Sequence, residues 1–322
     1  FVTPMVEEAE LIKAVKQSET IVDKVERKVT IIAELDPPKT LDIRKFTKGV
    51  KALDEAGVAA ITLADNSLAK TRICNVSIAS LLKNEISTPF LLHLSCRDHN
   101  MIGLQSRLLG MDVLGFHQVL AITGDPSKIG DFPGATSVYD ATSFKLLELI
   151  KQLNKGIGYS GASIKKETTF TAAAAFNPNV KNLSRCGRLI ERKIAAGADC
   201  FITQPIFNSE IIENLAELTL DYDTPFFVGI MPITSYNNAI FLHNEVPGIQ
   251  LSDDFLAKLE AVKDDKEKCQ QLALEESKQL IDHALKFFNG IYLITPFMRY
   301  DLTVDLVEYI HQKVEQSHQI IP

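Results

Sequence analysis

The stretch LAITGDPSKIGDFPG, residues 120–134, begins as an apolar run suited to a buried strand and then breaks into glycine, proline and aspartate. Seven other short apolar runs in the chain resemble its first half, and a segment with helical spacing follows each run. Continuous apolarity, in place of alternation, indicates strands covered on both faces, as in a parallel sheet. The eight runs are residues 29–35, 59–65, 90–96, 118–125, 169–176, 200–205, 226–232 and 290–296.

Amphipathic helices are predicted between these strands. Phe46, Val50 and Leu53 share one helical face, and Gly57 and Gly197 stand where glycine often ends a helix. Eight strand–helix units without a break in composition predict the α/β class and a single (β/α)8 TIM barrel, with a doubly wound open sheet as the alternative.

Two segments lie outside the repeat. Residues 1–28 are predicted to form an N-terminal helical extension or linker, with EEAELIKAVKQ (7–17) as an amphipathic helix, and the barrel domain then covers residues 29–322. Extra helices are expected between the seventh and eighth strands, within residues 251–288, with Ser252 as an N-cap.

Composition excludes several classes of protein. A chain of 322 residues with 46% hydrophobic and 23% charged residues is typical of a globular protein, and a net charge of −7 argues against a broad nucleic-acid surface. Five scattered cysteines without a C-x-x-C pair favour the reducing cytoplasm over a disulfide framework or zinc ribbon. No apolar run reaches the roughly 18 residues of a membrane span. The first residue is not Met, so we expect a processed chain or a piece of a longer one.

Polar residues gather just after the apolar runs, where a barrel places its active site. Two of them, Asp65 and Asp98, and also Asn208 after the sixth strand, are expected to be helix N-caps, because Asp and Asn often take that position after a strand. The polar positions are Glu34, Asp36, Thr62, Asp65, Asn66, His93, Ser95, Arg97, Asp98, Thr123, Asp125, Asn177, Asn179, Thr203, Gln204, Thr295 and Arg299.

Glu34 is the best candidate for chemistry on pattern alone. It directly follows TIIA and comes shortly before Pro37-Pro38, which neither continues a strand nor starts a helix on its own. Partial desolvation there would raise the pKa of the carboxyl and make it a usable acid at neutral pH. His93 lies inside the apolar run LLHLS, so on pattern alone it is first interpreted as a core histidine.

Gly124, Asp125 and Pro126 form the sharpest local feature. Glycine allows close approach of the backbone to a ligand, and proline stops the strand. The spacing to Gly130 and Gly134 matches neither G-x-x-x-x-G-K-[ST] nor G-x-G-x-x-G, so a generic phosphate loop is a poor explanation.

A metal site is an alternative interpretation of the same carboxylates. Glu34, Asp65, Asp98 and Asp125 fall near successive strand ends and could ligate Mg²⁺ in a metal-dependent lyase or hydrolase. No histidine pair accompanies them, so no metal is our first expectation.

Seven ordered motifs together resemble the methylenetetrahydrofolate reductase family, from about residue 29 to the C-terminus. They are AELDPPKT, LLHLSCRD, GLQSRLLGMDVLGFHQVLAITGDP, PGATSVYD, FNPN, RKIAAGADCFITQPIF and GIMPITS. The GATSVYD form is most similar to the reductase module that some bacteria fuse behind a homocysteine methyltransferase module. Such a module and a second copy of the chain are therefore possible partners.

The resemblance implies a flavoenzyme that reduces 5,10-methylenetetrahydrofolate to 5-methyltetrahydrofolate by ping-pong hydride transfer from NADH, NADPH or a redox partner protein. It implies that Glu34 protonates the folate nitrogen N-10 and that Asp125 lies beside flavin and pterin. Substrate contacts would come from Gln204, Asn238 and Arg299. The residues expected to hold FAD are Thr62, His93, Thr123, Gly124, Asp125, Tyr139, Phe176, Asn177, Arg192 and Lys193.

Four positions depart from the family pattern. Leu35 and Asp36 replace the aromatic residues that commonly follow the glutamate, and Asn238 stands in place of a glutamine. Cys186 stands where an acidic residue often meets the FAD ribose.

A folate-binding module without turnover is the remaining alternative, although such a module has little need for a buried acid at residue 34.

Overall fold

Eight parallel strands close into a barrel in the computed structural model, which describes residues 19–246 and 249–319. Each strand pairs with the next one in sequence, and the last returns to pair with the first. The single-barrel prediction is therefore confirmed and the open-sheet alternative is wrong. The strands are β1 (Thr30–Glu34), β2 (Ala60–Leu63), β3 (Phe90–Ser95), β4 (Gln118–Ile122), β5 (Thr171–Phe176), β6 (Cys200–Pro205), β7 (Phe226–Ile230) and β8 (Gly290–Ile294).

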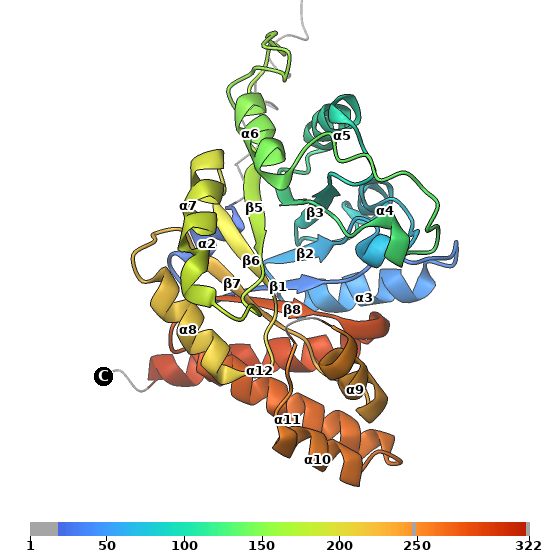
Figure 1. The fold of residues 1–322 in the computed structure, drawn as a ribbon, viewed down its shortest axis with the longest axis vertical. Helices are drawn as coiled ribbons and strands as arrows, with labels where there is room; N and C mark the ends of the chain where they lie inside the picture. The colour runs from blue at the N-terminus through green and yellow to red at the C-terminus, as the bar shows by residue number, and fades with distance from the viewer. Residues whose placement is uncertain (1–18, 247–248, 320–322) are drawn as a thin grey trace, which may run out of the picture.

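Helices surround this barrel (Figure 1). Gly57 and Gly197 follow their helices with φ of +82° and +110°, as the sequence predicted. Within the described residues, no helix is both long and apolar enough to cross a membrane. The ring consists of α3 (Arg44–Glu55), α4 (Asn75–Leu82), α5 (Met101–Val113), α6 (Ser143–Leu153), α7 (Gly187–Ala196), α8 (Ser209–Thr219), α11 (Lys266–Ala284) and α12 (Tyr300–Gln319).

Alternation along each strand decides which side chains face the barrel interior. In β1, Ile31 and Ala33 belong to the core between strands and helices, whereas Ile32 belongs to the inner core of the barrel. Because side chains alternate along a strand, Glu34 points inward like Ile32. In β2 and β8 the inward-facing residues are also the even-numbered ones, and in β3 they are the odd-numbered ones.

A short helix, α2 (Ile21–Val25), packs against the inner core at the N-terminal end of the strands. Ile21 and Val25 are buried, and the Ile21 amide donates a hydrogen bond to Oε1 of Gln118 in β4 (3.2 Å). This part of the predicted extension therefore contributes to the barrel core. The helix predicted over residues 7–17 lies outside the described residues.

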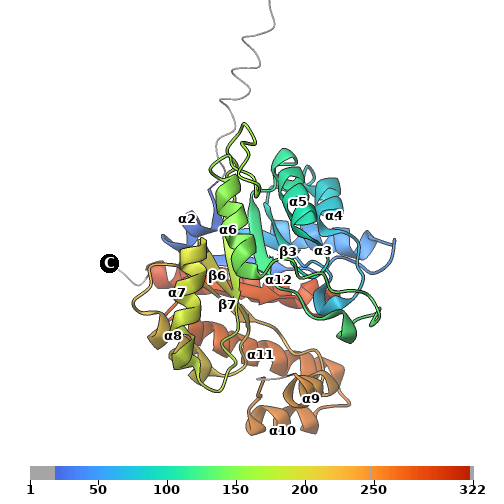
Figure 2. The same ribbon diagram turned by 45° about the horizontal axis from the view of Figure 1, so that its top comes forward.

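The extra helices between β7 and β8 form their own apolar cluster. α9 (Tyr236–Glu245) and α10 (Asp253–Ala261) enclose Phe207, Leu242, Phe255 and Leu259 and lie together at the edge of the molecule (Figure 2). The Ser252 hydroxyl accepts from the Phe255 amide, so the predicted N-cap is confirmed. The two helices predicted within residues 251–288 correspond to α10 and α11.

The strand within the stretch 120–134 ends earlier than its apolar residues predict. β4 ends at Ile122, and Gly124 has a φ of +86°, which favours glycine. A Cβ on Gly124 would lie 2.1 Å from Oγ of Ser95 at the end of β3. Packing against the neighbouring strand end thus requires this glycine.

Of the three predicted N-caps, only Asn208 is confirmed, because its Oδ1 accepts from the Glu210 amide. The predictions for Asp65 and Asp98 are wrong. Several loop residues separate β2 from α4 and β3 from α5, so other residues, Cys74 and Asn100, occupy the N-cap positions.

Candidate active site

Four inward side chains from adjacent strands form the floor of the mouth, the end of the barrel where the strands terminate. They are Glu34 from β1, Thr62 from β2, His93 from β3 and Tyr292 from β8. The Tyr292 hydroxyl donates a hydrogen bond to Oε2 of Glu34, and Nε2 of His93 lies 3.8 Å from the same oxygen. A carboxyl, an imidazole and a phenol therefore meet at one point.

Burial makes Glu34 an acid. Desolvation, with a smaller contribution from the negative charge of Asp36, raises the pKa of Glu34 to about 8, against opposing effects of Tyr292 and Arg72. Burial lowers the pKa of His93 to about 3, so the imidazole is neutral and its contact with Glu34 is no ion pair. At neutral pH Glu34 is therefore mostly protonated and able to donate.

Asp36 is anchored beside this carboxyl. Its Oδ2 lies 2.6 Å from Nη2 of Arg72, and Oγ of Ser67 donates to its Oδ1 (3.0 Å). Arg72 also donates to the Pro37 carbonyl (2.9 Å) and, through Nε, to Ser67 Oγ (3.2 Å). The loops after β1 and β2 are joined through this cluster.

Asp125 sits in a different setting after β4. Its side chain is exposed, and Oδ2 accepts from the Leu68 amide (3.1 Å). Six residues on, Asp131 accepts from the Thr71 amide (3.1 Å), and its own amide donates to the Ala69 carbonyl (3.3 Å). These bonds lock the loops after β2 and β4 together and hold Asp125 at the rim of the mouth.

A buried arginine that the sequence analysis gave no role completes this rim. Arg97 forms a bidentate pair with Asp98, with both N–O distances 2.7 Å, and donates to the Asp125 carbonyl (3.1 Å). Asp65, also buried, accepts from the Ser95 amide (3.0 Å). These bonds explain why neither aspartate is an N-cap.

The carboxyls proposed as Mg²⁺ ligands are not arranged to bind a metal ion. Asp98 is neutralised by Arg97, and Glu34 is mostly protonated at neutral pH. Across residues 19–246 and 249–319, no three His, Cys, Asp or Glu side chains gather as a metal site would require.

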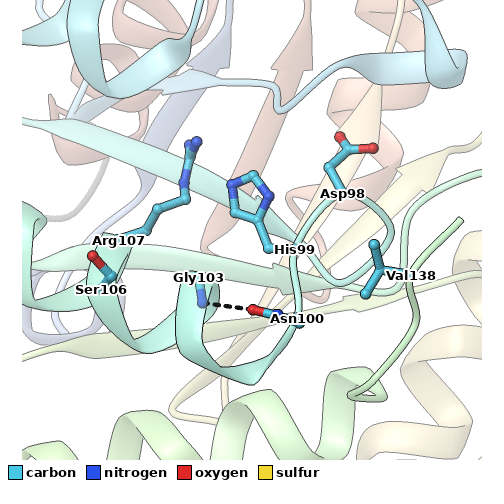
Figure 3. A pocket seen from close by; sticks show the side chains of 7 residues that line it. All are labelled: Asp98, His99, Asn100, Gly103, Ser106, Arg107 and Val138. Carbon is cyan, nitrogen blue, oxygen red and sulfur yellow. Dashed lines mark hydrogen bonds between the residues drawn. The ribbon is translucent and has the colours of Figure 1, made fainter. Parts of the chain in front are cut away.

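A cavity of about 470 Å³ opens beside the start of α5. Figure 3 shows His99 between Arg107 and Asp98, while Asn100 accepts from the Gly103 amide. None of the residues predicted to bind FAD or folate lines it, and of the rim residues described above it includes only Asp98. The residues around the cavity are Asp98, His99, Asn100, Gly103, Ser106, Arg107 and Val138.

The floor of the mouth has unsatisfied polar atoms that fit a polar cofactor. Thr62 Oγ1 and His93 Nε2 are buried without a hydrogen-bond partner among the described residues. Buried polar groups rarely stay unpaired, so a ligand with donor and acceptor atoms would be stabilised there. Lys193 is buried too, with Nζ donating to the Ala175 carbonyl (2.5 Å), and burial lowers its pKa to about 8.

The family model described as methylenetetrahydrofolate reductase matches residues 18–299 of this chain. The chain belongs to the methylenetetrahydrofolate reductase family. Its match covers the whole barrel from α2 to the loop after β8, including every residue of the mouth described above.

Curated relatives agree with this family. A probable methylenetetrahydrofolate reductase (NADPH) of Caenorhabditis elegans is 22% identical over 78% of this chain and 38% of its own length. Methylenetetrahydrofolate reductase (NADH) 1 of Arabidopsis thaliana is 23% identical over 84% of this chain and 46% of its length. The chain thus spans less than half the length of these relatives.

Two solved structures share the fold. An uncharacterised protein from Clostridium thermocellum that binds two copies of 5-methyl-5,6,7,8-tetrahydrofolic acid superposes with a TM-score of 0.63 at 16% identity, over 88% of this chain and 96% of that one. Dihydropteroate synthase from Xanthomonas albilineans gives 0.50 at 12% identity, over 92% and 95%.

Several residues assigned to FAD by family resemblance lie at the mouth, and one lies elsewhere. Thr123 is exposed just after β4, and the Tyr139 hydroxyl donates to the Gly124 carbonyl (3.1 Å). The Phe176 side chain instead packs in the outer core against Phe201 and Phe226. The parity of β5 turns this side chain into the outer core, and the assignment of Phe176 to FAD stays a prediction.

Two further FAD candidates are engaged in contacts within the protein. The Arg192 guanidinium is exposed and stacks 4.5 Å from the centre of the Phe144 ring. Asn177 is exposed and accepts from the Asn179 amide through Oδ1 (3.0 Å). Cys186, the departure near the ribose position, is half-buried at the N-cap of α7.

The substrate candidates fall into two groups. Gln204 is exposed at the end of β6 and is available to a ligand. Asn238 in α9 accepts from the Thr234 amide (3.3 Å), and Arg299 is bound to Asp301 (2.6 Å) and to Gln270 (2.7 Å). The charge of Arg299 is therefore already neutralised, which weakens its predicted role with a folate carboxylate.

Sequence reasoning missed Tyr292 and Arg72. Tyr292 lies inside an apolar run, where an aromatic residue normally signals core packing. Strand parity was the available signal, since a phenol two residues before the end of β8 faces the same interior as Glu34. Arg72 lies in a loop without any periodic pattern, so nothing local indicated its pairing with Asp36.

Proposed function

We propose that this chain catalyses the FAD-dependent reduction of 5,10-methylenetetrahydrofolate to 5-methyltetrahydrofolate, with hydride from a reduced nicotinamide. One observation carries the proposal: a carboxyl with 17% of its side chain exposed and a pKa raised to about 8 lies at the barrel mouth of a chain in this family. A group that is protonated at neutral pH and lies at the carboxyl end of the barrel strands, where such barrels place their active sites, is suited to general acid catalysis.

Glu34 would supply the proton that opens the folate bridge. It transfers a proton to N-10, the bond from this nitrogen to the bridging methylene breaks, and an iminium cation remains on the pterin nitrogen. The conjugate carboxylate of Glu34 is then left beside Tyr292, whose hydroxyl already donates to Oε2. A hydrogen bond to the charged form stabilises it once the proton has moved.

Asp125 would act through its charge. Its carboxylate is held at the rim by the Leu68 amide, and there a negative charge favours the cationic iminium. It also disfavours an anionic reduced flavin, which makes hydride donation easier. Gln204 would hydrogen-bond folate or nicotinamide in turn, because both substrates of a ping-pong flavoenzyme use one face of the ring.

Thr62 and His93 would hold the cofactor over the floor of the mouth, and bound FAD would carry hydride between the two substrates. Their unpartnered polar atoms support this assignment, and Lys193 would add positive charge near the end of β5. The relatives from C. elegans and A. thaliana are named for NADPH and NADH respectively, so both nucleotides are candidate donors here, and a redox partner protein is the third.

An anaerobic titration tests the proposal. The protein is reconstituted with FAD and mixed in parallel with NADH, NADPH and 5-methyltetrahydrofolate while the flavin absorbance is followed. We expect bleaching by the folate and by at least one nucleotide. Absence of a bound flavin spectrum together with absence of folate-dependent bleaching would overturn it, and flavin and folate binding without bleaching would support the binding module instead.

A further inference from the structure

We propose that Tyr292 and Asp36 are positioning residues for Glu34: the phenol fixes which carboxyl oxygen carries the acid proton, and the Asp36–Arg72 pair keeps that carboxyl neutral. The inference rests on the proposed function of Glu34 and assigns roles to two residues outside that proposal's reacting groups. Both arguments begin from side-chain contacts at the floor of the mouth.

Tyr292 selects the oxygen. β8 pairs with β1, and the phenol, 5% exposed, reaches Oε2 of Glu34 from the neighbouring strand. Burial raises the pKa of Tyr292, so its hydroxyl keeps its hydrogen and donates. A carboxyl oxygen that accepts this bond is the carbonyl-type oxygen, so the acid proton of Glu34 resides on Oε1.

Asp36 faces the same interior as Glu34. Leu35 between them is fully buried in the outer core, and its amide continues the ladder to the Thr62 carbonyl (3.0 Å). Residues two apart on extended backbone point to the same side, which brings the two carboxyls together. Two carboxyls in one site cannot both ionise easily, so the better stabilised one takes the charge.

Arg72 and Ser67 decide which of the two is ionised. Burial raises the pKa of Asp36 as well, but the Arg72 guanidinium, the Ser67 hydroxyl and the charge of Lys39 oppose this effect. For Glu34, only the hydrogen bond from Tyr292 and the weaker charge effect of Arg72 favour the ionised form. The facing His93 is neutral. Asp36 therefore carries the negative charge and Glu34 keeps the proton.

Direct titration of the Glu34 carboxyl tests this arrangement without relying on turnover. Infrared difference spectra of the whole protein, with the Glu34 band assigned by its loss in Glu34→Gln, give the pKa in each variant. We expect Asp36→Asn to lower the pKa of Glu34 by about one unit and Tyr292→Phe to raise it by a similar amount. Asp42→Asn, in the same loop and paired with Arg44, is the matched control and should leave it unchanged.

The rate of folate reduction gives the second readout. Asp36→Asn should move the alkaline limit of the pH profile downward by the same unit, whereas Tyr292→Phe should move it upward and lower the plateau about tenfold. If Asp36→Asn fails to fold, Ser67→Ala loosens the same anchor and should give a smaller shift in its direction.

The outcomes separate the two proposals. Unchanged Glu34 titration in both Asp36→Asn and Tyr292→Phe, or shifts in the same direction, would overturn the positioning roles. Opposite shifts in a protein that never reduces folate would support the positioning roles while the proposed function fails.

Discussion

The ends of β1 and β4 each present a carboxyl group to the barrel mouth, yet the two environments differ. Glu34 is enclosed by Tyr292 and His93, and burial raises its pKa to about 8. Asp125 is exposed and accepts a hydrogen bond from a loop amide. The same position at a strand end thus holds an enclosed, mostly protonated carboxyl in one case and an exposed side chain at the rim in the other.

Neighbouring strands account for the difference. The side chains beside Glu34 come from β3 and β8, whereas the loop after β4 turns at Gly124, which packs on Ser95. Substitutions at one strand end at a time therefore separate the effects of the two carboxyls.

Glu34→Gln removes the acid and should have the largest effect. We expect folate reduction by the reduced, FAD-loaded protein to slow by about 10²–10⁴-fold, the usual contribution of general acid catalysis. Flavin reduction by the nucleotide needs no such proton and should be unchanged. Stopped-flow absorbance measures the two half-reactions separately, and equal slowing of both would contradict the assignment.

Gly124→Ala should destabilise the backbone just after β4. The left-handed backbone and the approach to Ser95 Oγ should together cost about 2–4 kcal/mol in the free energy of unfolding. Gly115→Ala is the matched control, because φ is +79° there but nothing lies within 4 Å, so only the backbone cost of about 1 kcal/mol remains. Denaturant unfolding measures both, and equal losses would show that the Ser95 contact has no energetic role.

Asp125→Asn should have a smaller effect on rate than the change at Glu34. The amide oxygen still accepts from Leu68, so the loop stays in place while the charge disappears. We expect the folate half-reaction to slow roughly tenfold, equivalent to about 1.4 kcal/mol of transition-state stabilisation, with flavin still bound. A larger loss in the nucleotide half-reaction would assign the charge to the other substrate.

The pH dependence of stability should show the burial of Glu34. A folded pKa of about 8 against 4.5 for an unperturbed glutamate means that the folded state holds the proton more tightly. Its contribution is complete below pH 4.5 and is lost as pH rises toward 8, by up to about 1.4 kcal/mol per pH unit. Glu34→Gln should flatten this slope in denaturant unfolding, and parallel curves for the two proteins would disagree with it.

Much of the fold followed from local patterns. Continuous apolar runs and glycine-terminated helices predicted the barrel, because each reports burial or backbone geometry within a few residues. The predicted caps at Asp65 and Asp98 failed, since loop lengths and the buried Arg97 decide their partners. Strand parity, and not proximity in sequence, decides that the Phe176 side chain faces the outer core.

The candidate site was only partly predictable for the same reason. Glu34 could be found from its place between a strand and Pro37-Pro38, but its partners come from positions far along the chain. Tyr292 is 258 residues away and is brought to Glu34 by closure of the barrel. Contacts of this kind leave no local pattern in a single sequence.

The rate of folate reduction as a function of pH tests the central claim most directly. The reduced, FAD-loaded protein is mixed with 5,10-methylenetetrahydrofolate in single turnovers from pH 6 to 10, in parallel with Glu34→Gln. A protonated Glu34 with a pKa of about 8 predicts a plateau below that pH and a tenfold fall per unit above it, absent in the variant. A rate that rises or stays level through pH 8 would contradict the account.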